Sequence, residues 1–435
     1  MAASGAGGKD IKVLSGKVIV RVNLLDNSQK TLLVEPTTTV QDVIRTMADK
    51  VGFANPADDC LNFSLHEVKD GVTIERALPG GAEVVPIQES WDDSNAKFVF
   101  QIKLFTASLM ASTDSKIIYM AYIQSVYNII SGIYPVKLDD VAMLAALQLQ
   151  NKFGDHNPDS HKPGFLTQSL LEYIPNPWFN IRTPKEWEEK LFVAHSELST
   201  TTPMADYVAF VSGREYYGST LFGVRQKFDR KMPKTLLLGV NAKGVLLLKP
   251  GKPPQKDDVE AATEMVVLAS HPLSDIYRWA YKPGVNFYFE MKPEDDSEEN
   301  PVYTFSTVEG QHIADMLTDY AMALLREMGL NPDGTRRDDR NMGAVESDGD
   351  DSEDESEADD VVVAEEEAKE EAEAAPAEAA APEEAVAEEA PAEEAAAEGA
   401  SDLPPGWIEV EDPDSGDIYY YNNDTGESAW DKPTA

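Results

Sequence analysis

The sequence has a single cysteine, Cys60, among its 435 residues. One cysteine cannot form an intramolecular disulfide, and zinc sites built from four cysteines are excluded. Long apolar runs are also lacking, because no segment approaches the roughly 18 residues that cross a bilayer. The N-terminus has no apolar stretch behind a basic start. We therefore expect a soluble protein of a reducing, intracellular compartment.

Basic residues are scarce relative to acidic ones, and the formal net charge is −41. Much of this charge is local, because residues 346–402 hold 25 acidic residues and one lysine. Residues 1–345 are only mildly acidic. A protein that binds nucleic acid mainly through phosphate contacts shows the opposite bias. We expect no direct binding of nucleic acid.

The motifs of common enzymes are missing as well. There is no Gly-x-x-x-x-Gly-Lys-Ser/Thr phosphate loop, no Gly-x-Ser-x-Gly elbow and no His-Glu-x-x-His helix. His156 and His161 have no third ligand of a suitable type near them in sequence, which disfavours a metal site. Cys60 has no histidine partner in sequence and is expected to be structural. We expect no catalytic residue, no metal and no cofactor, and hence a non-enzymatic protein.

Composition sets two segments apart from the globular part of the chain. Residues 1–16 are expected to be disordered. Residues 331–402 are rich in Asp, Glu, Ser and Ala and lack the apolar surface that offsets chain ordering, which predicts a disordered acidic linker. Three serines among its acidic residues are candidates for phosphorylation: Ser347, Ser352 and Ser356.

Residues 17–108 predict the first lobe of a multidomain α+β protein. Residues 17–34 read as a hairpin around the Asp26-Asn27 turn, and a helix follows whose apolar residues share one face. Further strands are expected near residues 62–65 and 98–104. A strand pair, a helix and more strands are typical of a ubiquitin-like roll.

Two further lobes follow. Residues 109–218 have a helical period and predict a small all-α bundle. Residues 219–330 return to short strands, and a capping box at Ser306-Thr307-Val308-Glu309 predicts the start of a closing helix. About seven strands and one C-terminal helix are typical of a phosphotyrosine-binding (PTB) or pleckstrin-homology (PH) sandwich.

This order of roll, bundle and capped sandwich resembles a FERM domain, and specifically that of the talins. The resemblance is carried by the following segments: Phe153 to Asn157, His161 to Leu166, Tyr216-Tyr217-Gly218, Ile276 to Trp279, Phe287-Tyr288-Phe289 and Ser306 to Ile313. The chain differs from talins in having no extra ubiquitin-like lobe before the first, no long basic insertion in the first lobe and no helical rod after the third.

Five basic residues lie at the start of the third lobe: Arg225, Lys227, Arg230, Lys231 and Lys234. Such a cluster attracts an anionic phospholipid surface, at about 1 kcal/mol per base. The alternative is a solvated loop that protects a strand edge from aggregation. The resemblance to talins implies a loop that touches membrane and the membrane-proximal part of receptor tails, which favours the first interpretation.

Arg278 and Trp279 are expected at the entry to, or within, an inner strand of the same sandwich. The resemblance implies that the matching strand is an edge strand that accepts a receptor cytoplasmic tail of Asn-Pro-x-Tyr type by strand addition. The alternative is that Trp279 is part of the core. The chain's own segment Asn300-Pro301-Val302-Tyr303 is expected to be a turn into the last strand.

The last segment, residues 403–435, resembles a WW domain, which is a three-stranded all-β fold. The resemblance and the alternation of a strand assign two sets of residues. The expected core contains Trp407, Tyr420, Asn422 and Pro433. The expected groove for a polyproline peptide contains Tyr419, Tyr421, Asn423, Ser428 and Trp430.

Position 423 indicates which kind of proline-rich peptide this domain prefers. WW domains that read Pro-Pro-x-Tyr usually have a histidine where this chain has Asn423. The groove is more similar to those that accept Pro-Pro-Leu-Pro, and we expect that preference over Pro-Pro-x-Tyr.

Together these features predict a non-enzymatic membrane–cytoskeleton adaptor, located in the cytoplasm at a membrane or the cytoskeleton. Its FERM domain binds an anionic membrane or a receptor tail, and its WW domain recruits proline-rich partners. The alternative is a nuclear or RNA-processing scaffold that uses the WW domain and the acidic tail.

Overall fold

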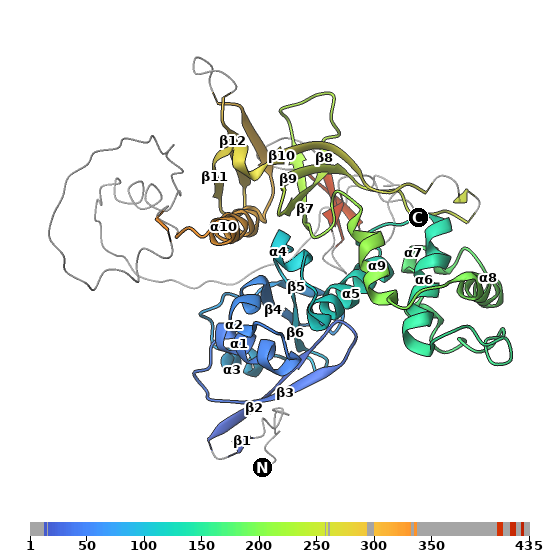
Figure 1. Cartoon of the computed structure of the whole chain (residues 1–435). Coiled ribbons are helices and arrows are strands. Elements are labelled where there is room, and N and C mark those ends of the chain that lie inside the picture. The colour runs from blue at the N-terminus through green and yellow to red at the C-terminus, as the bar shows by residue number, and fades with distance from the viewer. Residues whose placement is uncertain are drawn as a thin grey trace, which may run out of the picture. The chain divides into compact units, whose positions relative to one another are not determined.

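The computed structural model describes most of the three lobes and the strands of the C-terminal segment (Figure 1). The described residues are 13–14, 16–256, 258–259, 262–293, 300–331 and 335–336, and the backbone of 407–411, 418–422 and 428–429. Several of the predictions above concern residues outside these ranges, namely those for the acidic linker, for Ser347, Ser352 and Ser356, and for Asn423, Trp430 and Pro433. No helix in the described part is long and apolar enough to span a membrane.

The first lobe is a mixed sheet with one main helix against it, which confirms the predicted roll. Strands β2 and β3 form the hairpin, and Asn27 in its turn has a φ of 64°. Strand β6 pairs parallel to β2 and antiparallel to β4, and β3 lies beside β2 at one edge. The elements are β1 Val13–Leu14, β2 Lys17–Asn23, β3 Gln29–Val34, α1 Val40–Val51, α2 Pro56–Asp59, β4 Phe63–Val68, β5 Ile74–Ala77, α3 Val84–Glu89 and β6 Lys97–Ile102.

The helix α1 shows how the sequence sets a local element. Thr39 caps its N-terminus in a capping box with Asp42, and Gly52 ends it in a left-handed conformation. Val43 and Met47 lie on its buried face, one turn apart. The helix therefore begins, ends and packs where its sequence predicts.

The second lobe is an all-α bundle, as predicted. Trp187 and Tyr207 are fully buried in its core, and Thr183 and Glu186 form a second capping box at the start of α8. The helices are α4 Ala107–Met110, α5 Ser115–Ile130, α6 Leu138–Phe153, α7 Asn176–Phe179, α8 Pro184–Glu197 and α9 Pro203–Ser212.

The third lobe has seven described strands and one closing helix, which confirms the predicted sandwich. The strand order is β10-β9-β8-β7-β13-β12-β11, and every neighbouring pair is antiparallel. The elements are β7 Thr220–Gln226, β8 Thr235–Asn241, β9 Gly244–Lys249, β10 Val266–Pro272, β11 Ile276–Lys282, β12 Asn286–Met291, β13 Val302–Ser306 and α10 Gly310–Glu327.

The capping box predicted at Ser306 to Glu309 is wrong. Ser306 is the last residue of β13, and α10 begins at Gly310 without a side-chain cap. The Thr307 hydroxyl donates to the Gly223 carbonyl instead. A Cβ on Gly310 would lie 2.5 Å from the Asn286 carbonyl oxygen, so the close approach of the helix start to β12 requires glycine.

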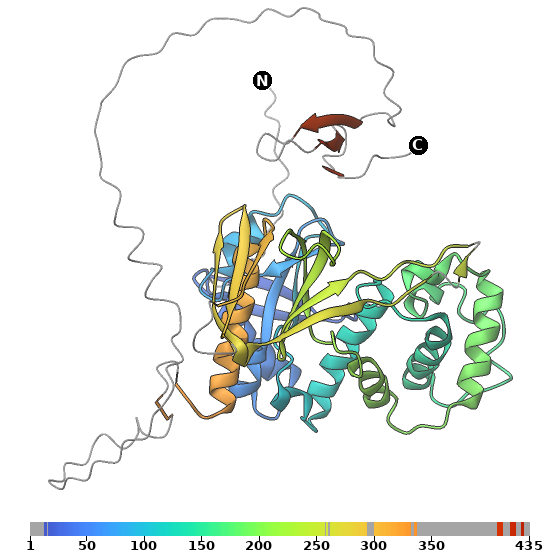
Figure 2. The ribbon, with the colours of Figure 1, turned by 90° about the horizontal axis from the view of Figure 1, so that it is seen from above.

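The first and third lobes are in direct contact, which gives a compact arrangement (Figure 2). The Arg76 guanidinium pairs with Glu309 and lies 4.4 Å from the centre of the Phe222 ring. Lys103 pairs with Asp319 on α10. At the end of α10, Arg326 donates to the Asn62 side chain of the first lobe at 3.1 Å. The neighbouring Glu327 accepts from the amide of Ser108, in α4 of the second lobe, at 2.8 Å.

The two segments that connect the lobes, at Phe105 and at Gly218, both bond the buried hydroxyl of Tyr320. Tyr320 of α10 accepts from the Phe105 amide at 3.2 Å and donates to the Gly218 carbonyl at 3.3 Å. The Gly218 amide in turn donates to the Tyr134 hydroxyl at 3.0 Å. Gly218 has a φ of 73°, and a Cβ there would lie 2.7 Å from the Phe105 Cβ. This junction therefore holds the helical lobe against the other two.

The C-terminal segment forms a separate three-stranded antiparallel sheet in the order β14-β15-β16. Its strands are β14 Trp407–Glu411, β15 Ile418–Asn422 and β16 Ser428–Ala429. Tyr421 is paired with Ser428, and Trp407 with Asn422, in the backbone register.

We expect the substitution Tyr320→Phe to lower the free energy of unfolding by about 1 to 3 kcal/mol, because it leaves buried backbone groups of both connections without their partner. Urea unfolding of the protein measures this. The matched control is Tyr207→Phe, since the Tyr207 hydroxyl is buried with no hydrogen-bond partner among the described residues. The control should be neutral or slightly stabilising. Equal losses in the two variants would contradict a special role for Tyr320.

Candidate functional site

The predicted basic residues lie at the β7–β8 connection, residues 227–234, which we call the basic loop. Lys227, Arg230, Lys231 and Lys234 are exposed, whereas Arg225 is half-buried on β7. Among the described residues, no acidic side chain forms an ion pair with any of these four exposed residues. Their positive charge is therefore available to a partner.

A buried glutamine fixes the shape of the basic loop. Gln226 is 2% exposed, and its side-chain amide donates to three carbonyls of the loop, those of Asp229, Met232 and Pro233. Its side-chain oxygen accepts from the Asp229 amide at 2.9 Å. Because one rigid core residue satisfies so many loop groups, the basic side chains project from an ordered scaffold.

An apolar residue lies among these charges. Phe228 is 36% exposed and packs edge-on against Tyr303 and Phe305 of β13. The strand β13 begins at Val302, in agreement with the expectation that Asn300 to Tyr303 lead into the last strand.

The strand that carries Arg278 and Trp279 is an edge strand, as the resemblance implies, so the predicted inner position is wrong. β11 ends the sheet order and pairs with β12 alone among the described strands. Arg278 forms two hydrogen bonds with the Glu290 carboxylate, at 2.8 and 2.9 Å. Trp279 is half-buried and packs against the core of the lobe. Trp279 is thus partly a core residue. The outer backbone edge of β11 has no strand partner among the described strands.

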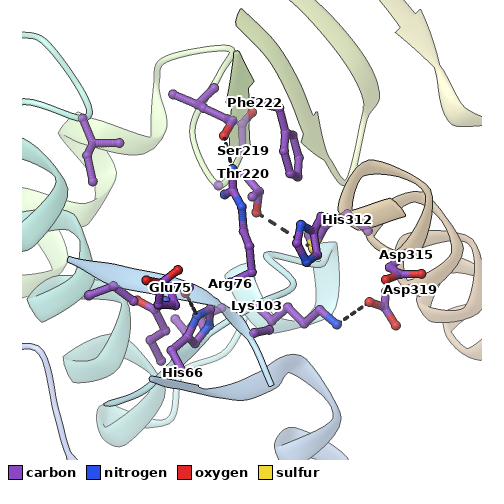
Figure 3. Close-up of a pocket in the computed structure, with 18 of the residues that line it drawn as sticks. His66, Glu75, Arg76, Lys103, Ser219, Thr220, Phe222, His312, Asp315 and Asp319 are labelled. Atoms are coloured by element: carbon purple, nitrogen blue, oxygen red, sulfur yellow. Dashed lines mark hydrogen bonds and ion pairs between the residues drawn. The ribbon is translucent and has the colours of Figure 1, made fainter. Parts of the chain in front are cut away.

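A cavity of about 1440 Å³ lies where the three lobes meet, and we call it the inter-lobe cavity (Figure 3). Its walls come from β4 to β6 of the first lobe, from α5 of the helical lobe and from β11 and α10 of the third lobe. Trp279 and Tyr281 of β11 line it together with His312 and Asp315 of α10. The cavity therefore borders both β11 and α10.

The charged groups of this cavity are mostly engaged. Arg76 and Lys103 pair with Glu309 and Asp319. His66 bonds the Glu75 carbonyl at 2.9 Å and the Ser64 hydroxyl at 2.7 Å. Burial lowers the pKa of His66 to about 4, so it is neutral at physiological pH.

A third histidine, His195, lies next to His156 and His161 and was not predicted from the sequence. His195 of α8 completes a triangle, in which the ring centres are 5.3 to 5.5 Å apart. No group of residues in the described part of the chain has the geometry to hold a metal ion. The only signal for His195 in the sequence is the helical period that places Leu191 and His195 on one face of a helix. This period does not indicate that His156 and His161 pack against that face.

Two histidines of this triangle, His161 and His195, form hydrogen bonds with the backbone. The His195 Nε2–H donates to the Gly154 carbonyl at 3.0 Å, and its Nδ1 is buried without a partner among the described residues. His161 Nδ1 accepts from the Asn157 amide at 3.1 Å. Burial, with a smaller effect from the neighbouring histidines, lowers the pKa of both His161 and His195.

Four family models match the chain, one for each lobe and one for the C-terminal sheet. The first lobe, residues 16–105, matches the Ras association (RalGDS/AF-6) domain. Residues 110–222 match the FERM central domain, and residues 222–325 match the PTB domain of IRS-1 type. Residues 403–433 match the WW domain.

Talins are among the curated relatives. The chain is 27% identical over 312 residues to Talin-B of Dictyostelium discoideum and 25% identical over 340 residues to Talin-1 of Gallus gallus, in each case over 71% of this chain. It is 32% identical over 188 residues, 43% of its length, to FERM domain-containing protein C of Dictyostelium discoideum. The chain spans only about a tenth of the length of these relatives, from 11 to 12%.

Solved structures share the fold of the three lobes. The FERM and C-terminal domain complex of Drosophila Merlin matches 71% of this chain and 97% of that chain, with a TM-score of 0.54 and 18% identity. The Dictyostelium discoideum Myosin VII MyTH4-FERM MF2 domain matches 70% of this chain and 58% of that chain, with a TM-score of 0.52 and 19% identity. Both support the three-lobed architecture.

We expect the protein to lose stability as the pH falls from about 6.5, the unfolded-state pKa of histidine, towards the lower folded-state pKa of His195. The folded state excludes a proton that the unfolded state accepts, so the stabilisation is complete above this window and is lost below it. His195→Gln, which keeps a donor for the Gly154 carbonyl, should reduce the difference in unfolding free energy between pH 7 and pH 5. His312→Gln, at an exposed histidine, is the control. An unchanged pH dependence in His195→Gln would exclude this residue as the cause.

Proposed function

We propose that this chain, a talin-like FERM protein with a C-terminal WW domain, is a non-enzymatic adaptor at the interface of membrane and cytoskeleton. Its FERM region binds an anionic membrane or a receptor tail, and its WW domain recruits a proline-rich protein. The observation that carries this proposal is the basic loop, because it combines exposed cations that have no ion-pair partner in the described part of the chain with an ordered scaffold.

The electrostatic argument favours a surface as the partner of the basic loop. Four exposed bases at about 1 kcal/mol each give a substantial attraction to anionic phospholipid headgroups. Phe228 adds a partly exposed ring beside them. A solvated loop that only protects a strand edge requires neither the scaffold formed by the buried Gln226 nor the exposed ring of Phe228.

A receptor tail of Asn-Pro-x-Tyr type is the second proposed ligand of the FERM region. The free backbone edge of β11 supports it, since an extended peptide gains main-chain hydrogen bonds by adding a strand to such an edge. β11 and α10 both line the inter-lobe cavity, which lies beside this strand. In this arrangement Arg278 and Trp279 shape the site through Glu290 and the core, and the peptide pairs with the backbone.

The WW domain supplies the other half of the adaptor. We propose that Tyr419, Tyr421, Asn423, Ser428 and Trp430 form its polyproline groove, with Pro-Pro-Leu-Pro preferred over Pro-Pro-x-Tyr. The backbone register supports this for one pair, since Tyr421 lies opposite Ser428. A nuclear or RNA-processing scaffold is the rival, and it requires no affinity for membranes.

The match of the first lobe favours a further ligand, a Ras-family GTPase. The strand β3 has β2 on one side and no other strand partner among the described residues. Leu33 of β3 is 52% exposed, and Arg21 of β2 is exposed nearby in the hairpin register, opposite Thr31. An open edge with apolar and basic side chains can extend the sheet of a partner.

We expect the triple substitution Lys227→Glu, Arg230→Glu and Lys231→Glu to weaken binding to vesicles that contain anionic lipid roughly a hundredfold or more, because each base contributes about 1 kcal/mol and reversal adds repulsion. Vesicle sedimentation measures this, and remaining binding should be insensitive to salt. The control reverses three exposed lysines of the helical lobe, Lys116, Lys162 and Lys190. Unchanged sedimentation of the first variant would return the basic loop to the role of a solvated turn and favour the scaffold.

We expect the full chain to bind a Ras-family GTPase loaded with a non-hydrolysable GTP analogue more tightly than the GDP form. Arg21→Glu should weaken this binding about tenfold, since it opposes charge at the edge of the contact. Lys116→Glu is the matched control on the helical lobe. Calorimetric titration that detects no binding of either nucleotide form would remove this candidate.

A further inference from the structure

We propose that the connection between β9 and β10 is an internal ligand for the WW domain of the same chain. Residues 249–256 at the start of this connection read Lys-Pro-Gly-Lys-Pro-Pro-Gln-Lys, and we call them the proline segment. The inference rests on the polyproline groove proposed above. It adds that an external proline-rich protein must displace the proline segment in order to bind.

The exposure of the proline segment repeats every three residues. Gly251 and Pro254 are partly buried, whereas the two residues before each of them and the two residues after Pro254 are exposed. A polyproline II helix has three residues per turn, so residues three apart lie along one edge. The pattern indicates a segment of this kind that rests on the protein along one edge and presents its other two edges to solvent.

Contacts along the buried edge hold the proline segment in place. A Cβ at Gly251 would lie 2.4 Å from the Thr263 carbonyl oxygen, so this close approach requires glycine. The Thr263 amide donates to the Lys252 carbonyl at 3.0 Å, and the Thr263 hydroxyl accepts from the Lys252 amide at 3.0 Å. Pro254 lines an apolar cavity of about 240 Å³ together with Trp178 of α7. Because the backbone of the segment is already ordered, it loses little conformational entropy on binding.

The exposed edges carry the groups that a WW groove recognises. Pro250 and Pro253 are both exposed and have the Pro-x-x-Pro spacing, which places their rings along one edge of a polyproline II helix. Aromatic-lined grooves of WW domains bind proline-rich segments in this conformation. The two prolines also border the cavity at Trp178, but Pro254 is the one proline of the segment that is not exposed.

Charge complementarity favours the WW domain of this chain as the partner. The proline segment has three lysines and no acidic residue, and two aspartates follow it at positions 257 and 258. Residues 403–435 hold eight acidic residues and one lysine, which gives a formal net charge of −7. Opposite charges on two surfaces promote their encounter and disfavour partners of the wrong sign.

The chain between the two parts is long enough for the contact to form within one molecule. Residues 337–402, 66 in number, separate the described end of the third lobe from the WW match. A chain of this length spans at most about 220 Å, whereas a compact body of about 320 residues has a radius of gyration of about 20 Å. A tethered ligand has an effective concentration on the order of 1 mM. We therefore assign the contact to one molecule and not to a pair of copies.

The test titrates a fluorescent Pro-Pro-Leu-Pro peptide into the full chain. The double substitution Pro250→Ala and Pro253→Ala removes the two rings of the exposed edge. It should tighten binding of the peptide about fivefold, because the internal ligand no longer competes for the groove. The matched control is Pro36→Ala with Pro158→Ala, at exposed prolines of the first and second lobes, and it should leave the affinity unchanged.

Cross-linking gives a direct readout of the same contact. Lys432 is the single lysine of residues 403–435. In a dilute solution of the intact chain, an amine-reactive reagent should join Lys432 preferentially to Lys252 and Lys256, and mass spectrometry identifies the products. The double proline variant keeps these lysines and should lose the products. Cross-links from Lys432 that spread evenly over the exposed lysines of the three lobes would overturn the proposal.

The outcomes separate this inference from the function on which it rests. If the intact chain and the double proline variant bind the peptide equally, the internal ligand is wrong while the polyproline groove stands. If none of the variants binds the peptide, the groove and the inference fall together. A sedimentation mass that rises with concentration in the intact chain, but not in the double proline variant, would assign the proline segment to a second copy and overturn the contact within one molecule.

Discussion

The structure depends most on the junction at Tyr320, where one buried hydroxyl bonds the backbone of both connections between lobes. Gly218 makes this possible, because a side chain at its position would collide with Phe105. With the connections fixed, the first and third lobes come close enough for the Arg76–Glu309 and Lys103–Asp319 pairs. The inter-lobe cavity is a consequence of that approach. A chain in which the lobes separated would keep the basic loop but lose the cavity.

Local features could be predicted from the sequence because they depend on neighbours in the chain. The face of α1 and the seven strands of the third lobe follow from apolar periodicity. The capping box at Ser306 failed because β13 continues through that residue and Thr307 bonds a neighbouring strand instead. Whether β11 is an inner or an edge strand depends on sheet order, which periodicity does not report. The contact of His195 with His161 and the Arg76–Glu309 ion pair could likewise not be predicted, because the residues in each pair are distant in sequence.

Charge is distributed unevenly over the chain. The net charge of −41 leaves the basic loop as a local exception, fixed by a buried glutamine within an acidic protein. At the cavity the basic residues Arg76 and Lys103 are paired with Glu309 and Asp319. The proposed ligand of the basic loop, an anionic surface, follows from this exception. The ligand proposed for the segment that matches the WW domain, residues 403–433, adds a class that depends on proline rings.

The central claim is that one chain bridges a membrane and a proline-rich protein. The direct measurement is flotation of anionic vesicles in the presence of a fluorescent Pro-Pro-Leu-Pro peptide, with and without the full chain. The account predicts that the peptide floats with the vesicles when the intact chain is present. It also predicts that this effect is lost both on reversal of Lys227, Arg230 and Lys231 and in Trp430→Ala. A peptide that stays behind with the intact chain, or that floats equally with both variants, would contradict it.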